Sequence, residues 1–180
     1  LHGEPFLLDM QPVEEAPGTA ASPSHQTTAP QFERFCLGLL LRDPEILYQV
    51  DRRFASLELD RLGPEDFSGT DSQVVFSAVR SALAQDDEEP SEGWRRELAP
   101  ALIEQAEVLV AEAGEADLLL PRVQAEAVSH ALRLRRRHLE SELVELRYQL
   151  QTAQEEQAPV AEVRSLMHDL QRMGAQKNVV

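Results

Sequence analysis

The sequence predicts an all-α protein, and three observations lead to this prediction. Leu, Ala, Glu, Gln and Arg dominate the 180 residues, whereas the alternation of apolar and polar residues that is typical of strands is nearly absent. Apolar side chains instead recur every three or four residues, which places them on one face of a helix. Between Ala125 and Lys177 this spacing continues on both sides of Ala158-Pro159. We therefore predict a small multi-helix bundle, followed by a long antiparallel helical hairpin and preceded by a disordered Pro-rich tether.

The predicted tether covers residues 1–30. It contains five prolines, separated mainly by Ala, Ser and Thr (Pro5, Pro12, Pro17, Pro23 and Pro30). A segment of this composition cannot bury enough apolar surface to offset the entropy lost on folding. We predict a disordered linker here. Because the chain begins at Leu1 rather than at Met, we also expect it to be the tail of a longer protein.

The predicted bundle covers residues 31–120, and its first two helices are the clearest. From Gln31 onward, apolar residues occur at positions i, i+3, i+4, i+7 and i+8 (Phe32, Phe35, Cys36, Leu39 and Leu40). Asp43-Pro44-Glu45 then predicts a helix start, with Asp as the cap, Pro at the first helical position and Glu near the positive end of the helix dipole. The inner face of this second helix consists of apolar residues at helical spacing (Ile46, Leu47, Val50 and Phe54).

The rest of the bundle follows from turn and capping signals. Gly63–Phe67 predicts a short turn that inserts Phe67 into the core, and Thr70–Gln73 has the pattern of a capping box. The helix that follows presents a buried face (Val75, Phe76, Val79 and Leu83). Residues 86–92 are predicted to be a solvated acidic connector. A helix opened by Trp94 is expected to be interrupted or restarted at Pro100, and the next to stop at Gly114.

The predicted hairpin covers residues 121–180. Its first arm carries one apolar stripe (Val128, Leu132, Leu139, Leu143, Leu146 and Leu150), and its second arm carries another (Val160, Val163, Met167 and Leu170). Pro159 cannot continue a preceding helix but suits the first position of a new one. We therefore expect two helices that fold back on each other at Ala158-Pro159 and project from the bundle.

Charge and cysteine content restrict the classes of function. The net charge is −15, and residues 1–120 hold 8 Lys and Arg against 24 Asp and Glu, whereas residues 121–180 hold 9 against 8. The acidic part should repel phosphate backbones, so we expect DNA contact to be weak or absent. Cys36 is the only cysteine, which indicates a reducing, cytoplasmic environment. No apolar run long enough for a membrane span is present, and no signal peptide is recognised.

The sequence offers little support for catalysis. It contains no phosphate-binding loop of the GxGxxG or GxxxxGK type. His130, His138 and His168 lack the Cys or HExxH spacing that would support a metal site. Cys36 lies on an apolar helical face and is interpreted as a buried structural thiol. We expect no catalytic residue, metal or cofactor in this chain.

A basic run at residues 133–138 permits two interpretations. On a helix, Arg133, Arg136 and Arg137 share a face, while Arg135 points elsewhere. These arginines could contact nucleic acid or an acidic partner, or they could be neutralised by the chain's own acidic bundle. We favour neutralisation, because the neighbouring bundle is strongly negative.

The order of these segments resembles one known family, the C-terminal helicase-interacting domain of bacterial DNA primase. The resemblance depends on FCLGLLLRDPEIL (35–47), on LGPEDFSGTDSQVVFSAV (62–79) and on the terminal hairpin. It covers about residues 31–177 and implies a helical bundle whose hairpin docks on the hexameric replicative DNA helicase. The primase active site would then lie upstream of this chain. The strongly acidic bundle departs from the family pattern.

The resemblance implies that residues near the turn bind the helicase (Leu150, Ala153, Val160, Val163, Arg164 and Met167). One alternative is the similar N-terminal domain of the replicative helicase itself, but a helicase would be expected to continue into an ATPase domain. A second is a DNA-binding helical regulator that uses Arg133, Arg136 and Arg137. A third is a coiled-coil adaptor whose apolar seam pairs between two chains.

Overall fold

The computed structural model describes residues 31–85, 89–114 and 120–180. The predicted linker over residues 1–30 and part of the acidic connector lie outside these ranges. Within them the chain forms seven α-helices and one short 3₁₀ helix, with no strand, so the predicted all-α fold is confirmed. The helices are α1 (Gln31–Arg42), α2 (Ile46–Ser56), η1 (Pro64–Asp66), α3 (Thr70–Ala84), α4 (Pro90–Glu97), α5 (Pro100–Gly114), α6 (Leu120–Glu155) and α7 (Val160–Val179).

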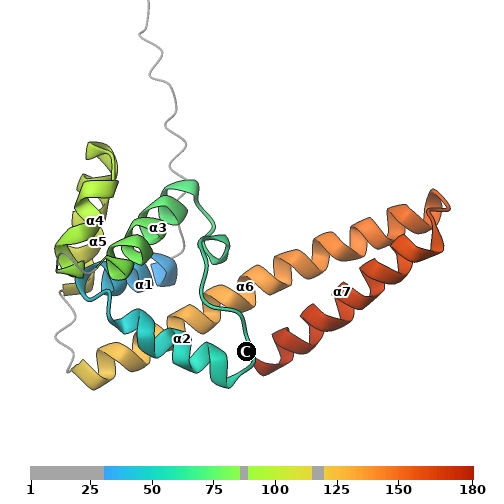
Figure 1. Ribbon diagram of the computed structural model, residues 1–180, viewed down its shortest axis with the longest axis horizontal. Helices are drawn as coiled ribbons and strands as arrows, with labels where there is room; N and C mark the ends of the chain where they lie inside the picture. Colours follow the sequence, from blue (N-terminus) through green and yellow to red (C-terminus); the bar gives the residue numbers. More distant parts are fainter. Residues whose placement is uncertain (1–30, 86–88, 115–119) are drawn as a thin grey trace, which may run out of the picture.

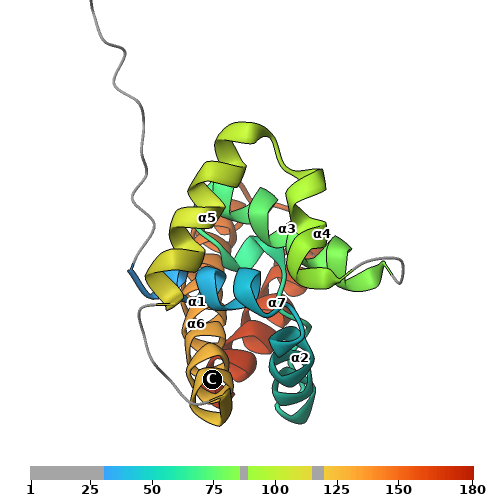
Figure 2. The same ribbon diagram turned by 90° about the vertical axis from the view of Figure 1, so that its left-hand side faces the viewer.

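The helices form a bundle at one end of the molecule and a hairpin that projects from it. Helices α1 to α5 lie at one end of the molecule, where α1 and α2 contact the first half of α6, and the second half of α6 extends away from them with α7 beside it (Figure 1). Seen from the bundle end, α1 lies among the other helices rather than at their edge (Figure 2). Within the described ranges no helix is both long and apolar enough to cross a membrane.

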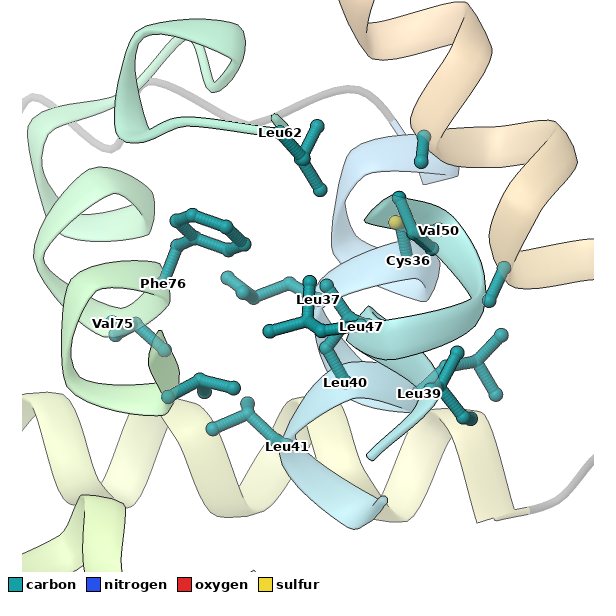
Figure 3. Close-up of a cluster of buried hydrophobic side chains, with 14 of the residues drawn as sticks. Cys36, Leu37, Leu39, Leu40, Leu41, Leu47, Val50, Leu62, Val75 and Phe76 are labelled. Atoms are coloured by element: carbon teal, nitrogen blue, oxygen red, sulfur yellow. The ribbon is translucent and has the colours of Figure 1, made fainter. Parts of the chain in front are cut away.

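Helix α1 is the centre of the core. Its residues 37–41 are buried, including four leucines on different sides of the helix, so apolar contacts surround it (Figure 3). A β-carbon added at Gly38 would lie 2.3 Å from the carbonyl oxygen of Leu109, which shows how closely α1 and α5 cross. Trp94 of α4 is fully buried, and its indole Nε1 donates a hydrogen bond to the carbonyl of Leu41 at 3.2 Å.

Two predicted helix starts use other groups than expected. At α2 the N-cap is Glu45, with no capping side chain, and the amide of Ile46 instead donates to the backbone carbonyl of Asp43. The predicted capping role of the Asp43 side chain is therefore wrong. At α3 the N-cap is Gly69, and the side chain of Gln73 donates to the carbonyl of Phe67 at 2.9 Å. The predicted capping box is wrong as well, because Gln73 secures the preceding turn instead.

The remaining boundaries lie close to the predicted ones. Helix α4 begins at Pro90, so the acidic connector ends earlier than residue 92. The predicted restart at Pro100 is confirmed, and α5 is helical up to Gly114, where the described range ends. Pro159 is the N-cap of α7 and precedes the first helical residue, one position from the prediction.

The hairpin turn closes with a left-handed residue. Gln157 has φ 57°, and the amide of Ala158 donates to the carbonyl of Ala153 at 2.8 Å. This combination is a Schellman motif, which pairs carbonyls that the end of a helix leaves free. With 36 residues, α6 is about 54 Å long. Helix α7 returns along it, and Val180 packs against the bundle core.

Candidate partner-binding surface

The base of the hairpin is fixed to the bundle by a buried ion pair. Asp66 of η1 and Arg135 of α6 are both buried, and two separate nitrogen–oxygen pairs between them measure 2.8 Å. Arg135 also donates to the carbonyl of Arg61 at 2.7 Å, and the amide of Gly63 donates to Asp66 at 2.8 Å. The guanidinium lies over the ring of Phe54. The polar contacts of Arg135 thus join α6 to the segment that precedes α3.

A second buried carboxylate pairs with a neighbouring arginine of α6. Glu33 of α1 is fully buried and pairs with Arg137 of α6 at 2.6 Å. The hydroxyl of Ser68 donates to the same carboxylate at 2.8 Å. Arg137 donates a further hydrogen bond to the carbonyl of Asp66 at 2.9 Å. Two arginines two residues apart thus hold α6 against α1 and η1.

These contacts account for half of the basic run. The preferred interpretation, neutralisation by the bundle, holds for Arg137 and extends to Arg135. Arg136 is exposed and pairs with Glu140 of its own helix at 3.3 Å. Arg133 is exposed as well, beside a hollow that is also lined by Phe32 and His130. Of the three arginines considered as possible nucleic-acid contacts (Arg133, Arg136 and Arg137), Arg133 and Arg136 are exposed.

Burial shifts the pKa of two groups near this base. It raises the pKa of Asp66 above its ordinary value, an effect that the Arg135 guanidinium and the Gly63 amide oppose. Burial, with Glu33 and Asp66 nearby, raises the pKa of the Cys36 thiol to about 12. A thiol with so high a pKa stays protonated and is a poor nucleophile. The prediction of a buried structural thiol is confirmed.

The histidines considered as metal ligands lie in different environments. His130 is largely buried against the ring edge of Phe35, with 5.3 Å between ring centroids, and desolvation lowers its pKa. His168 is exposed on α7. Across the described ranges, no three His, Cys, Asp or Glu side chains are grouped so that they could hold a metal ion.

The two arms meet along a single seam. On α6 the seam contains Leu139 and Leu143, which are buried, and Leu146, which is half-buried. The half-buried apolar residues of α7 recur at helical spacing (Val163, Leu166, Leu170 and Met173). Near the open end of the hairpin, Lys177 pairs with Glu140 at 3.2 Å. No residue of α7 is buried, so this helix has a partner on one side only.

The seam divides the six predicted partner-binding residues into two sets. Leu150, Ala153 and Val163 are buried or half-buried, on the sides of the arms that face each other. Val160 is 73% exposed, Met167 is 47% exposed, and Arg164 is exposed between them. The spacing of i, i+4 and i+7 places this second set on one side of α7. We call Val160, Arg164 and Met167 the α7 stripe.

Two exposed apolar side chains of α6 escaped the sequence-based prediction. Val144 is 64% exposed and Tyr148 is 68% exposed, one turn apart in the projecting half of the helix. Both fall outside the seam spacing of Leu139, Leu143 and Leu146. An apolar residue that breaks the spacing of its own helix is the signal that could have identified them.

No protein-family model, no curated protein and no solved structure matches this chain. The functional interpretation therefore depends on the geometry of the chain itself and on the resemblance of its segments.

Proposed function

We propose that this chain is a non-catalytic docking module, the helicase-binding C-terminal domain of a bacterial DNA primase. One observation carries the proposal. The apolar seam residues of α6 and α7 pack against each other. Large apolar side chains nevertheless remain exposed on the outer sides of both arms, in the part that extends beyond the bundle. Exposed apolar groups that the chain does not need for its own packing are typical of a protein interface.

The base of the hairpin suits this role. The ion pairs of Arg135 with Asp66 and of Arg137 with Glu33 fix the orientation of α6 relative to the bundle. A helix held in one orientation loses little conformational entropy when its far end binds a partner. The hairpin would therefore present its tip as a preorganised surface.

In the proposed mechanism, this chain attaches the primase to the replicative helicase. Helices of the hexameric replicative helicase would pack against the tip, and the chain would act in the cytoplasm, where Cys36 stays reduced. Binding of this module would raise the effective concentration of the primase active site near unwound DNA. Primer synthesis would then occur where the helicase exposes template, without any reacting group in this chain.

The α7 stripe allows a direct test. In the variant Val160→Asp/Met167→Asp, two exposed apolar groups become charged without entering the seam. We expect its affinity for the replicative helicase of the same organism, measured by biolayer interferometry, to fall at least about tenfold, as is usual for residues at the centre of an interface. A matched control is Val108→Asp, because Val108 is 52% exposed on α5 of the bundle.

Two results would contradict the proposal. The first is that the unmodified chain fails to bind the helicase at micromolar concentration. The second is that the α7 variant and the Val108→Asp control bind equally well. Circular dichroism of each variant excludes loss of helix as the cause of a weakened interaction.

Of the rival functions, the coiled-coil adaptor has less support than the docking module. Its pairing surface is the seam, which α6 and α7 already cover within one chain. A DNA-binding regulator retains Arg133 and Arg136, and would show binding to duplex DNA that weakens steeply with salt and with Arg133→Ala.

A further inference from the structure

The hairpin tip carries a groove as well as the α7 stripe. The groove is an open hollow between the two arms, on one side of the seam and next to the turn. Ala153 and Leu166 provide its apolar floor, and Tyr148 stands at its α6 edge. Glu162 and Leu166 line the groove from α7, whereas Val160, Arg164 and Met167 do not. The groove and the stripe are therefore two different surfaces of the same hairpin.

The charge of the groove has one sign. Three carboxylates line it (Glu145, Glu156 and Glu162), and no Lys or Arg does. The bundle neutralises its buried carboxylates with arginines, as Arg135 does for Asp66. At the groove, by contrast, the hydrogen bond that Glu145 accepts comes from the neutral side chain of Gln149, at 2.9 Å. A ligand that brings positive charge would complete this site.

The apolar content of the groove indicates a protein rather than a small cation. Tyr148 is 68% exposed, because it lies outside the seam through which α6 packs against α7. An exposed tyrosine beside an apolar floor is the usual anchor of a helix-binding surface, because its ring packs and its hydroxyl remains hydrated. The hollow is lined by both arms of the hairpin, and a groove between two helices can take a third helix.

We propose that this groove binds a basic amphipathic helix of a partner protein. An apolar side chain of that helix would lie over Ala153 and Leu166 beside Tyr148, and flanking Lys or Arg side chains would pair with Glu145, Glu156 and Glu162. The identity of the partner as the helicase depends on the function proposed above; the chemistry of the bound helix does not.

Charge opposes the two occupants that this sequence could supply. Residues 1–30 contain four carboxylates and no Lys or Arg, so this segment would be repelled by the groove. A second copy of the chain has a net charge of −15, which opposes its approach to an acidic surface. The charge of the groove therefore favours a locally basic partner protein.

The test uses two adjacent residues as a matched pair: Glu155, the last residue of α6, and Glu156 in the turn that follows. Glu156 lines the groove, whereas the neighbouring Glu155 does not and accepts a hydrogen bond only from Gln151 of its own helix. The probe is a fluorescein-labelled helical peptide with leucines on one face and lysines on the others, and its binding is followed by fluorescence anisotropy. A peptide with glutamates in place of the lysines serves as the charge control.

We expect the lysine peptide to bind the full chain and the glutamate peptide not to bind. Glu156→Lys should weaken the lysine peptide about tenfold, since an attractive pair becomes repulsive, whereas Glu155→Lys should change the affinity by about twofold at most. Tyr148→Ala, which alters no charge, should also weaken binding. Equal effects of the two lysine variants, together with no effect of Tyr148→Ala, would overturn the groove assignment.

The two proposals fail separately. Helicase binding that survives Glu156→Lys and Tyr148→Ala, with peptide binding insensitive to both, leaves the docking function and removes the groove. Peptide binding with the expected pattern, in a chain that does not bind the helicase, leaves the groove and removes the primase assignment. A photoreactive benzoylphenylalanine at position 148 would connect the two, because the helicase peptide that it labels should be rich in Lys or Arg.

Discussion

The two halves of α6 belong to one continuous helix but are held in place by different means. In the first half, Ala127, Ala131 and Leu134 are completely buried against the bundle, and Arg135 is anchored by Asp66. In the second half one side faces α7 and the others face solvent, and α7 itself has no buried residue. The same local structure is thus supported by a core at one end and by a single seam at the other.

This difference separates stability from binding. A region supported by many buried contacts unfolds only with the whole domain, whereas a region with one seam opens locally at lower free energy. Substitutions in the first half should therefore unfold the molecule, and those in the second half should change the hairpin alone. A docking surface placed in the second half can vary without endangering the fold. Four predictions test this contrast, beginning with the largest effect.

Arg135→Ala should cost the most. It would leave the buried carboxylate of Asp66 without its partner and would remove the contact with the Phe54 ring. Breaking a buried ion pair from one side costs about 3–5 kcal/mol. We expect this loss in the free energy of unfolding, measured by urea denaturation and circular dichroism. Arg136→Ala is the control, because Arg136 pairs with Glu140 at the surface, where ion pairs contribute about 0–1 kcal/mol. If both variants lose the same free energy of unfolding, the buried pair of Arg135 and Asp66 contributes no more than a surface ion pair.

Substitution of two glycines, one in the bundle and one in α7, tests how tightly each region is packed. In the bundle, a β-carbon at Gly38 would meet Ala113 at 2.9 Å and the Leu109 carbonyl at a shorter distance, so Gly38→Ala should force α1 and α5 apart. Overpacking of this kind costs about 1–3 kcal/mol. In α7 a β-carbon at Gly174 would meet nothing within 4 Å, and Gly174→Ala should stabilise the helix by about 0.5–1 kcal/mol. Thermal unfolding of both variants should shift in opposite directions; a shift in the same direction would contradict the contrast.

Val163→Asp should open the hairpin and leave the bundle folded. Val163 is half-buried in the seam, where an aspartate would lose hydration without gaining a partner, at a cost of about 1–3 kcal/mol. We expect hydrogen–deuterium exchange to increase along α7 while the amides of α1 stay protected. Val160→Asp, three residues earlier on the exposed stripe, should leave both exchange patterns unchanged. Faster exchange in α1 after Val163→Asp would show that the two regions unfold together.

The sequence predicted the helices well because their signals are local. Apolar spacing marks α1, α2, α3, α6 and α7, and Pro159 marks the turn, since each signal depends on residues within a few positions of one another. The capping box at Thr70–Gln73 failed because the N-cap of α3 is Gly69, one residue before the expected one. The side chain of Gln73 donates to the carbonyl of Phe67 and does not accept from an N-cap amide as the pattern requires.

The candidate site was harder to predict. Whether one of its residues lies in the seam or on the surface depends on which side of each arm faces the other arm. Val163 and Val160 are both apolar residues of one helical pattern, yet the first lies in the seam and the second is exposed. Likewise, the sequence offered no reason to pair Arg137 with Glu33, which lies 104 residues away. Such pairs depend on how the helices pack and have no counterpart in local spacing.

Gln157→Gly should give the smallest effect, and it acts at the turn that joins the two arms. Gln157 adopts φ 57°, a left-handed conformation that costs a residue with a β-carbon about 1–2 kcal/mol and costs glycine almost nothing. Glycine also has more freedom in the unfolded chain, so the net gain should be about 0.5–1 kcal/mol. Because the gain is confined to a region that opens locally, we expect slower hydrogen exchange at residues 153–163, with a midpoint of bundle unfolding that moves little. A clear rise in that midpoint would instead show that the tip and the bundle share one cooperative transition, against the separation inferred from the two halves of α6.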